Sequence, residues 1–261
     1  MQSTLAFLSL FYVFLLFLFL SIMVRKTRAN KKTTTPFTPM FESDRFRTEK
    51  NQETYEKLNI YRSVWAKRKV ILDELNGEIR RNFESRGWLP LLDVEHPPLA
   101  TLIREFYSNL SVHSNYSNTQ YVRSWIRGEE YVITPSAVAI ALGVPLIQQL
   151  VYPYTKTPQL DDIMSLLTGT SIRWGTDPRI IPHELTELNY LFFQISCHSI
   201  WLISHLHSIP LERCVFLYLL VTDAPISFPS LFISSLAEVR MSSAKSHGLF
   251  FPVFIHGICY T

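Results

Sequence analysis

The chain lacks every short motif that would identify a common catalytic or metal-binding site. It has no G-x4-GK phosphate loop, no D-[ST]-G protease turn, no G-x-S-x-G elbow and no C-x2-C pair. It has only three cysteines, at 197, 214 and 259, and their odd number and wide spacing argue against a disulfide framework. We therefore expect reduced, mostly buried thiols, which favour an intracellular setting.

The chain also lacks a strong charge bias. Its formal net charge is +3, and five basic residues without an acidic one fall within 25–32. From residue 87 onward, nine Lys or Arg stand against thirteen Asp or Glu. Because phosphate neutralisation dominates nucleic-acid affinity, this balance argues against a nucleic-acid partner for residues 87–261.

Five acidic residues are candidates for the metal-holding carboxylates of a ribonuclease-H type transposase. They fall at predicted helix starts and in turns, where Asp is by default a cap or turn residue, and no strand-rich stretch surrounds them. The sequence therefore argues against a working metal site at these positions. The five residues are Asp161, Asp162, Asp177, Asp223 and Glu238.

A cluster of histidines and cysteines within eighteen residues could suggest zinc: Cys197, His198, His205, His207 and Cys214. Structural zinc prefers ligand pairs two to four residues apart with a second pair downstream, and that pairing is absent. Buried or rim histidines are the favoured interpretation. The sequence thus predicts no catalytic, cofactor-binding or metal-binding residue.

The five tryptophans, at 65, 88, 125, 174 and 201, are spread evenly along the chain. This distribution is typical of core anchors rather than of a base-stacking platform.

A long apolar run opens the chain. Residues 5–24 contain no charge and could span the ~30 Å hydrocarbon core of a bilayer, so residues 1–24 are predicted as a transmembrane helix. The basic cluster and a Pro–Thr linker follow at 25–40. The positive-inside rule then predicts a single-pass anchor with a cytosolic C-terminal body. Alternatively, translation starts at Met23, the first 22 residues are in-frame upstream sequence, and the protein is cytoplasmic or nuclear.

The pattern over 122–134 predicts a small β-hairpin. Strands at 124–128 and 129–134 meet at a glycine turn, with Tyr131 and Ile133 on one face. Thr134 and Pro135 then start a helix that Gly143 ends.

Elsewhere the apolar spacing is helical. One or two amphipathic helices are predicted over 42–69, where the basic run 67–69 is either a solvated helix face or a nucleic-acid contact. Arg104 and Glu105 are expected off the apolar stripe of the helix ending at 110, and 111–120 is expected to be a loop. Further helices are predicted at 160–167, 183–208, 210–221 and 230–247. The predicted fold is mainly α, one helical domain over 41–261 with one small hairpin.

Several of these segments together carry a family resemblance. RGW at 86–88, REFYSNL at 104–110 and WIRG at 125–128, leading to ALGVP at 141–145, resemble the plant transposon protein domain of plant mobile elements. The likeness continues through Trp174, 200–213 and 249–252 and covers about 41–261. It implies an origin in a transposable element, brings no catalytic residue, and suggests that the C-terminus is truncated.

These observations favour a non-enzymatic helical domain that binds protein partners or is a degenerate remnant. The alternative is nucleic-acid binding in the life cycle of the element, through the basic residues at 25–32 and 67–69. No cofactor is expected, and the sequence does not identify a partner.

Overall fold

The computed structural model describes residues 40–260, with gaps at 66, 94–97, 148–151, 153–157, 172–173, 175–177, 202–206 and 246–247. The predicted membrane helix at 5–24 and the linker at 25–39 lie outside these residues. Within the described ranges, no helix is both long and apolar enough to cross a bilayer. Residues Phe41–Thr261 pack as one compact unit, which is mainly helical and contains small antiparallel sheets.

A three-stranded antiparallel sheet replaces the predicted two-stranded hairpin. It consists of β1 (Ser111–Ser114), β2 (Gln120–Ile126) and β3 (Glu129–Ile133), in the order β1-β2-β3. The predicted turn between β2 and β3 is present: Arg127 and Gly128 both have positive φ, as a type I′ turn requires. The expectation of a loop over 111–120 was wrong for β1. That strand pairs because Asn115 accepts hydrogen bonds from the backbone of Ser117 and Thr119 and so closes a tight turn.

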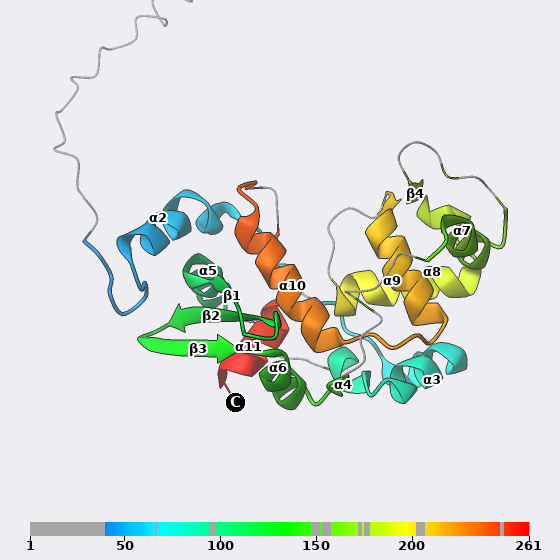
Figure 1. Ribbon diagram of the computed structural model, residues 1–261, viewed down its shortest axis with the longest axis horizontal. Helices are drawn as coiled ribbons and strands as arrows, with labels where there is room; N and C mark the ends of the chain where they lie inside the picture. The colour runs from blue at the N-terminus through cyan, green and yellow to red at the C-terminus, as the bar shows by residue number, and fades with distance from the viewer. Residues whose placement is uncertain are drawn as a thin grey trace, which may run out of the picture. The chain divides into compact units, whose positions relative to one another are not determined.

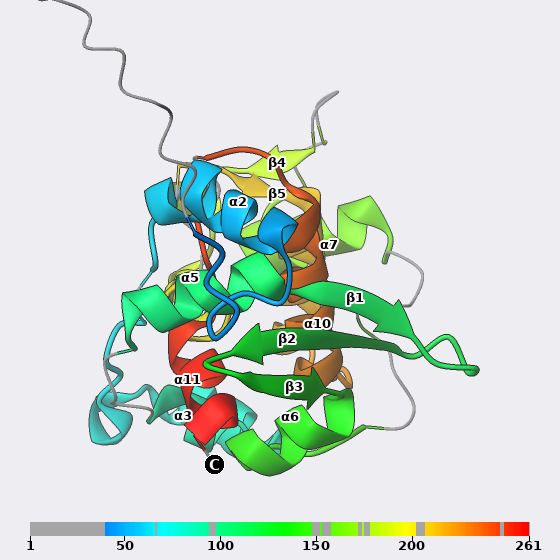
Figure 2. The same cartoon turned by 90° about the vertical axis from the view of Figure 1, so that its left-hand side faces the viewer.

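Helices cover one face of this sheet (Figure 2). Contacts to β2 come from α5 (Ala100–Asn109) and α10 (Phe228–Met241), and α6 (Pro135–Leu142) and α11 (Pro252–Tyr260) pack beside them. α2 (Glu49–Lys57) lies on α5. Val122, Ile126 and Ile133 are buried against this helical layer. α6 begins and ends as predicted, with the Thr134 side chain capping its start and Gly143 in the left-handed conformation at its end.

A second group of helices follows in the chain (Figure 1). It contains α7 (Leu160–Thr168), α8 (Glu187–Ile195) and α9 (Leu211–Val221), with α3 (Gly77–Ser85) and α4 (Leu89–Leu92) nearby. α8 continues as a π-helical turn, Ser196–Ile200. The prediction of one helix over 183–208 was wrong at both ends. The helix begins only at Glu187, after its cap Thr186, and its π-helical turn ends at Ile200. Outside this range, β4 (Arg179–Ile180) pairs with β5 (Ile209–Pro210). α10 likewise starts two residues before its predicted position and ends at Met241.

The predicted helices over 42–69 are only partly present. α2 and a 3-10 turn (Asn59–Tyr61) form, but the chain is then extended. Val64 forms a parallel bridge with Leu249, and the amide of Arg68 donates to the carbonyl oxygen of His198. Pairing with distant backbone therefore overrides the local helical spacing, and the 67–69 run is not on a helix face.

Four of the five tryptophans are core residues, as predicted. Trp88 and Trp201 are buried, while Trp65 and Trp174 pack against the core. Trp125 is the exception, because it belongs neither to the apolar core nor to the side chains packed on it.

The segments 86–88 and 141–145 meet in space. Gly87 has a φ of +66°, and a Cβ added there would lie 2.9 Å from Pro145 Cγ. Trp88, the next residue, is buried and makes an edge contact with the ring of Phe228. The glycine is needed both for its left-handed backbone and for the close approach of the proline.

Arg86 closes the end of α9. Its guanidinium donates to the carbonyl oxygens of Leu219, Leu220 and Ala224 at 3.1, 3.0 and 2.7 Å. A helix leaves its last carbonyls short of N–H partners, and a buried arginine supplies several donors at once. The Arg86 side chain also lies 3.3 Å from the carboxylate of Asp223.

Two further arginines have the same role. Arg62, which is buried, donates to carbonyl oxygens at the end of α10: those of Val239 at 3.3 Å, Ala244 at 3.2 Å and Ser242. Arg240 Nε donates at 2.8 Å to the carbonyl oxygen of Leu110, the residue that ends α5. Three helices thus end on guanidinium groups from distant segments.

Gly87→Ala is expected to destabilise the protein by roughly 2 kcal/mol or more, because a left-handed backbone alone costs a non-glycine residue about 1–2 kcal/mol and the Cβ meets Pro145. The free energy of unfolding in urea measures this. The control is Gly77→Ala at the start of α3, where an added Cβ would have no atom within 4 Å. We expect this change to leave stability unchanged or to increase it slightly. Equal effects at the two glycines would contradict the close-approach argument.

Arg86→Ala is expected to cost roughly 2 kcal/mol or more of unfolding free energy, since the carbonyls at the end of α9 lose charged donors. Arg86→Lys should recover only part of the loss, because an ammonium lacks the planar fork. The matched control is Arg81→Ala, at an exposed position on α3, the helix that ends just before Arg86. It should change stability by less than about 0.5 kcal/mol. Full recovery by lysine would show that charge alone is needed.

Candidate functional site

The structure does not gather the candidate carboxylates. Asp161 and Asp162 lie in the first turn of α7, where acidic residues favour the helix N-terminus. Asp223 follows α9 and pairs with Arg86, and Glu238 lies on α10. Asp177 lies outside the described residues. In the described part of the chain, no three His, Cys, Asp or Glu side chains lie close enough to hold a metal ion.

The candidate zinc ligands are also dispersed. Cys197 and Cys214 are buried, and the Cys214 thiol donates to the carbonyl oxygen of Ile209. His198 lies in the π-helical turn, where its ring Nε2 is 3.1 Å from Gln194 Oε1. His205 lies outside the described residues. All three cysteines are free, as expected.

One member of each set meets at Arg213, a residue that the sequence analysis did not single out. The guanidinium of Arg213 lies 3.2 Å from the centroid of the Trp201 ring, and Nη1 donates to the Trp201 carbonyl oxygen at 2.9 Å. Burial lowers the pKa of Arg213 to about 10. Cys197, Glu212 and Glu238 are coupled electrostatically to Arg213, so the π-helical turn after α8, α9 and α10 contribute to one cluster of titratable groups.

The chemistry of this cluster is that of a packed interior. Burial raises the pKa of the Cys197 thiol to about 12 and also raises that of the Glu238 carboxyl. A thiol held in its neutral form at physiological pH is a poor nucleophile. Trp201 stacks on the cation instead of a carboxylate, and the rings of Tyr152 and Phe216 surround it. The arrangement stabilises a buried arginine.

The polar residues of REFYSNL are similarly occupied. Glu105 is only 1% exposed and pairs with Arg45 at 2.7 Å and Arg127 at 3.3 Å, so its predicted position off the buried stripe was wrong. The Asn109 amide donates to the carbonyl oxygens of Arg45, Glu105 and Trp125 and accepts from the amide of Arg47. Because burying a charge is costly without partners, this network fixes α5 against β2 and the preceding loop.

The basic run 67–69 is not one continuous cationic surface. Lys67 Nζ is buried and has no hydrogen-bond partner among the described residues, and burial lowers its pKa to about 8, partly offset by the charge of Asp93. Arg68 and Lys69 are exposed, and the Arg68 carbonyl accepts a hydrogen bond from Ser199. The Lys67 ammonium is therefore poorly placed to contact a phosphate.

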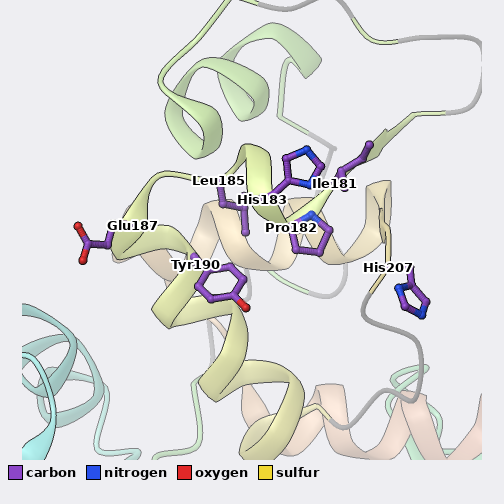
Figure 3. Close-up of a pocket in the computed structure, with 7 residues that line it drawn as sticks. All are labelled: Ile181, Pro182, His183, Leu185, Glu187, Tyr190 and His207. Atoms are coloured by element: carbon purple, nitrogen blue, oxygen red, sulfur yellow. The ribbon is translucent and has the colours of Figure 1, made fainter.

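A shallow depression of about 530 Å³ lies beside the start of α8 (Figure 3). We call it the α8 depression. Tyr190 and Glu187 come from α8, 181–185 from the turn before it, and His207 from the segment before β5. Ile181 and Tyr190 are 43% and 39% exposed. The lining residues are Ile181, Pro182, His183, Leu185, Glu187, Tyr190 and His207.

Comparison with protein families matches residues 84–261 to a family described as "Putative plant retrotransposon-related domain". The match covers more than half of the chain and begins just before Arg86, so it includes the segments on which the resemblance was based. Comparisons with curated proteins and with solved structures gave no significant match.

Lys67→Met should stabilise the protein at pH 7, where the wild type carries a buried ammonium. The pKa of Lys67 is about 8 when folded, against about 10.4 for an ordinary lysine. Between these values the unfolded chain binds more protons, so wild-type stability from this residue rises with pH and the advantage of methionine shrinks. Urea unfolding at pH 7 and above pH 9 measures this. Lys50→Met, at an exposed position on α2, is the control, and an equal pH response would contradict the burial of Lys67.

Proposed function

Because the chain belongs to the plant retrotransposon-related domain family, and so derives from a transposable element, we propose that it is a non-enzymatic binding domain whose partners are proteins. The observation that supports this is the α8 depression. It combines exposed apolar side chains with two histidines and a carboxylate at its rim. Exposed apolar patches rimmed by polar groups are typical of protein-interaction sites.

The composition of the depression fits a protein partner. Tyr190 is a partly exposed tyrosine, a residue type that often dominates binding energy at interfaces. Ile181, which also lines the depression, extends the exposed apolar surface. His183, Glu187 and His207 at the rim offer hydrogen-bonding groups that could orient a partner.

The use of charge supports a binding scaffold as well. Arg62, Arg86 and Arg240 end helices, and Arg213 is stacked inside the protein. These cations hold the fold and are not available to neutralise phosphates. Binding to a protein partner does not require free cations for phosphate neutralisation.

Nucleic-acid binding is the second candidate function. The basic residues at 25–32 lie outside the described residues. Because the Lys67 ammonium is buried, the 67–69 run has fewer cations available for phosphate contact than its sequence suggests. A different surface, the sheet formed by β1, β2 and β3, favours it. Membrane attachment through residues 5–24 stays a prediction from the sequence, as does the cytosolic orientation of the body.

The test is affinity capture from plant extract with the tagged full chain, compared with two variants. Tyr190→Ala alters the α8 depression, while Ile140→Ser changes a more exposed apolar residue on α6, at 83% exposure. We expect at least one protein that the wild type and Ile140→Ser retain and that Tyr190→Ala loses more than tenfold, as removal of an interface anchor predicts.

An identical protein set for all three chains would contradict the assignment of the partner site to the α8 depression. The non-enzymatic part has its own check. A hydrolytic or strand-transfer activity that disappears on substitution of Asp161 or Asp162 would make the protein an enzyme.

A further inference from the structure

The outer face of the β1-β2-β3 sheet carries large side chains that lie outside the apolar core. Successive residues of a strand alternate between the two faces. On β2, Val122 and Ile126 face the helices, so Tyr121, Arg123 and Trp125 lie on the opposite face. Figure 2 views the sheet from this side, and no helix of the described part of the chain crosses in front of it.

Cross-strand pairing extends this set into a row. His113 lies opposite Tyr121, with ring centroids 5.3 Å apart and planes inclined by 22°. The Arg123 guanidinium carbon lies 5.7 Å from the centroid of the Tyr121 ring. Trp125 is the next residue of β2 on this face, opposite Glu130 of β3. Histidine, tyrosine, arginine and tryptophan therefore follow one another across the sheet.

This row lies outside the apolar core. Tyr121, Arg123 and Trp125 are half-buried, and neither Tyr121 nor Trp125 belongs to the core or packs on it. Arg123 has no carboxylate partner in the described part of the chain, and Arg123 Nε and Trp125 Nε1 have no hydrogen-bond acceptor there. Both atoms lie under neighbouring atoms, so a side-chain rotation is needed before either can donate.

We propose that this face binds single-stranded RNA, with bases stacking on Tyr121 and Trp125 and an RNA oxygen accepting from Arg123. Aromatic side chains on an open sheet provide flat platforms for unpaired bases, whatever their sequence. The site differs from the α8 depression, so the proposal does not rest on the proposed protein-binding function.

The face carries few free cations, so the charge balance of residues 87–261 does not indicate a nucleic-acid site. The same scarcity of cations sets how RNA affinity depends on salt. Arg47 at the rim already pairs with Glu130, which leaves Arg123 as a cation for phosphate contact. Stacking, not counterion release, must therefore supply most of the affinity. For single strands the slope of log K against log salt is about −0.7 per phosphate neutralised, so a shallow slope near that value is expected.

Ser111 and His113 favour RNA over DNA. The Ser111 hydroxyl is 2.9 Å from His113 Nε2, and the two residues pair with Arg123 and Tyr121 on β2. A ribose 2′-hydroxyl can both donate and accept, so it can join this hydroxyl–imidazole pair, while deoxyribose cannot. Duplex DNA is disfavoured, because its bases stack within the helix and must be flipped out at a cost before they can stack on the protein.

The test uses the full chain and a fluorescent oligouridine of about ten nucleotides, a length within the usual single-strand site size. Anisotropy is measured at raised salt, which weakens contacts of the 25–32 cluster. Trp125→Ala and Tyr121→Ala should each weaken binding about tenfold or more, while Trp125→Phe should retain most of it. Arg123→Gln should flatten the salt dependence. Tyr190→Ala, in the α8 depression, should leave RNA binding unchanged.

Circular dichroism of each variant separates loss of binding from loss of folding. Binding that survives Trp125→Ala and Tyr121→Ala, or no binding at roughly 10⁻⁴ M protein, overturns the proposal. Equal affinity for the matching oligodeoxyuridine overturns the assignment to RNA, and a steep salt slope assigns the binding to the basic cluster. Concentration-dependent dimerisation that Trp125→Ala abolishes would assign the face to a second copy of the chain, also against the proposal. A failure here leaves the protein-capture test of the α8 depression unaffected.

Discussion

Guanidinium groups at the ends of helices supply charged donors to backbone carbonyls at the points where distant segments of the chain meet. Arg62, Arg86 and Arg240 each donate to carbonyl oxygens at or beyond the last turn of a helix far away in sequence. A buried carbonyl without a donor is costly, so each contact fixes where one segment may sit against another. Arg86 shows the consequence most clearly, because Gly87 and Trp88 follow it directly and place the chain against Pro145 and Phe228.

Buried polar groups need hydrogen-bond or ionic partners inside the protein. This need explains why residues of catalytic type do not form a reaction site in the described part of the chain. Glu105 is held by two arginines, and Asn109 holds the start of the domain against α5 and β2. Cys197 and Glu238 are coupled to the stacked Arg213. Burial raises the pKa of the thiol and of the carboxyl, which favours the neutral form of each. In the described part of the chain, these groups serve packing.

Two surfaces of the described part of the chain have side chains suited to a partner. The α8 depression is apolar with a polar rim, which is suited to a protein. The outer sheet face is aromatic with an arginine that has no carboxylate partner among the described residues, which is suited to unstacked bases. A protein derived from a transposable element could use both at once, because they involve different elements of the fold and no shared residue.

The sequence by itself determined those elements whose signals lie within a few residues of each other. α6, with Thr134 at its start and Gly143 at its end, and the turn at Gly128 followed from local capping and turn chemistry. The buried stripe of α5 and the all-round apolar α9 followed from helical spacing. The family resemblance, drawn over about 41–261 and matched over 84–261, likewise needed no structure.

Only the tertiary structure decided features whose partners are distant in the chain. The segment after Tyr61 is extended because Leu249 and His198, far along the chain, pair with it. Glu105 is buried because Arg45, sixty residues earlier, reaches it. Trp125 was expected in the core, yet strand alternation and the position of the helices place it on the open face. Local spacing shows which residues share a face, but only packing against distant segments decides which face meets water.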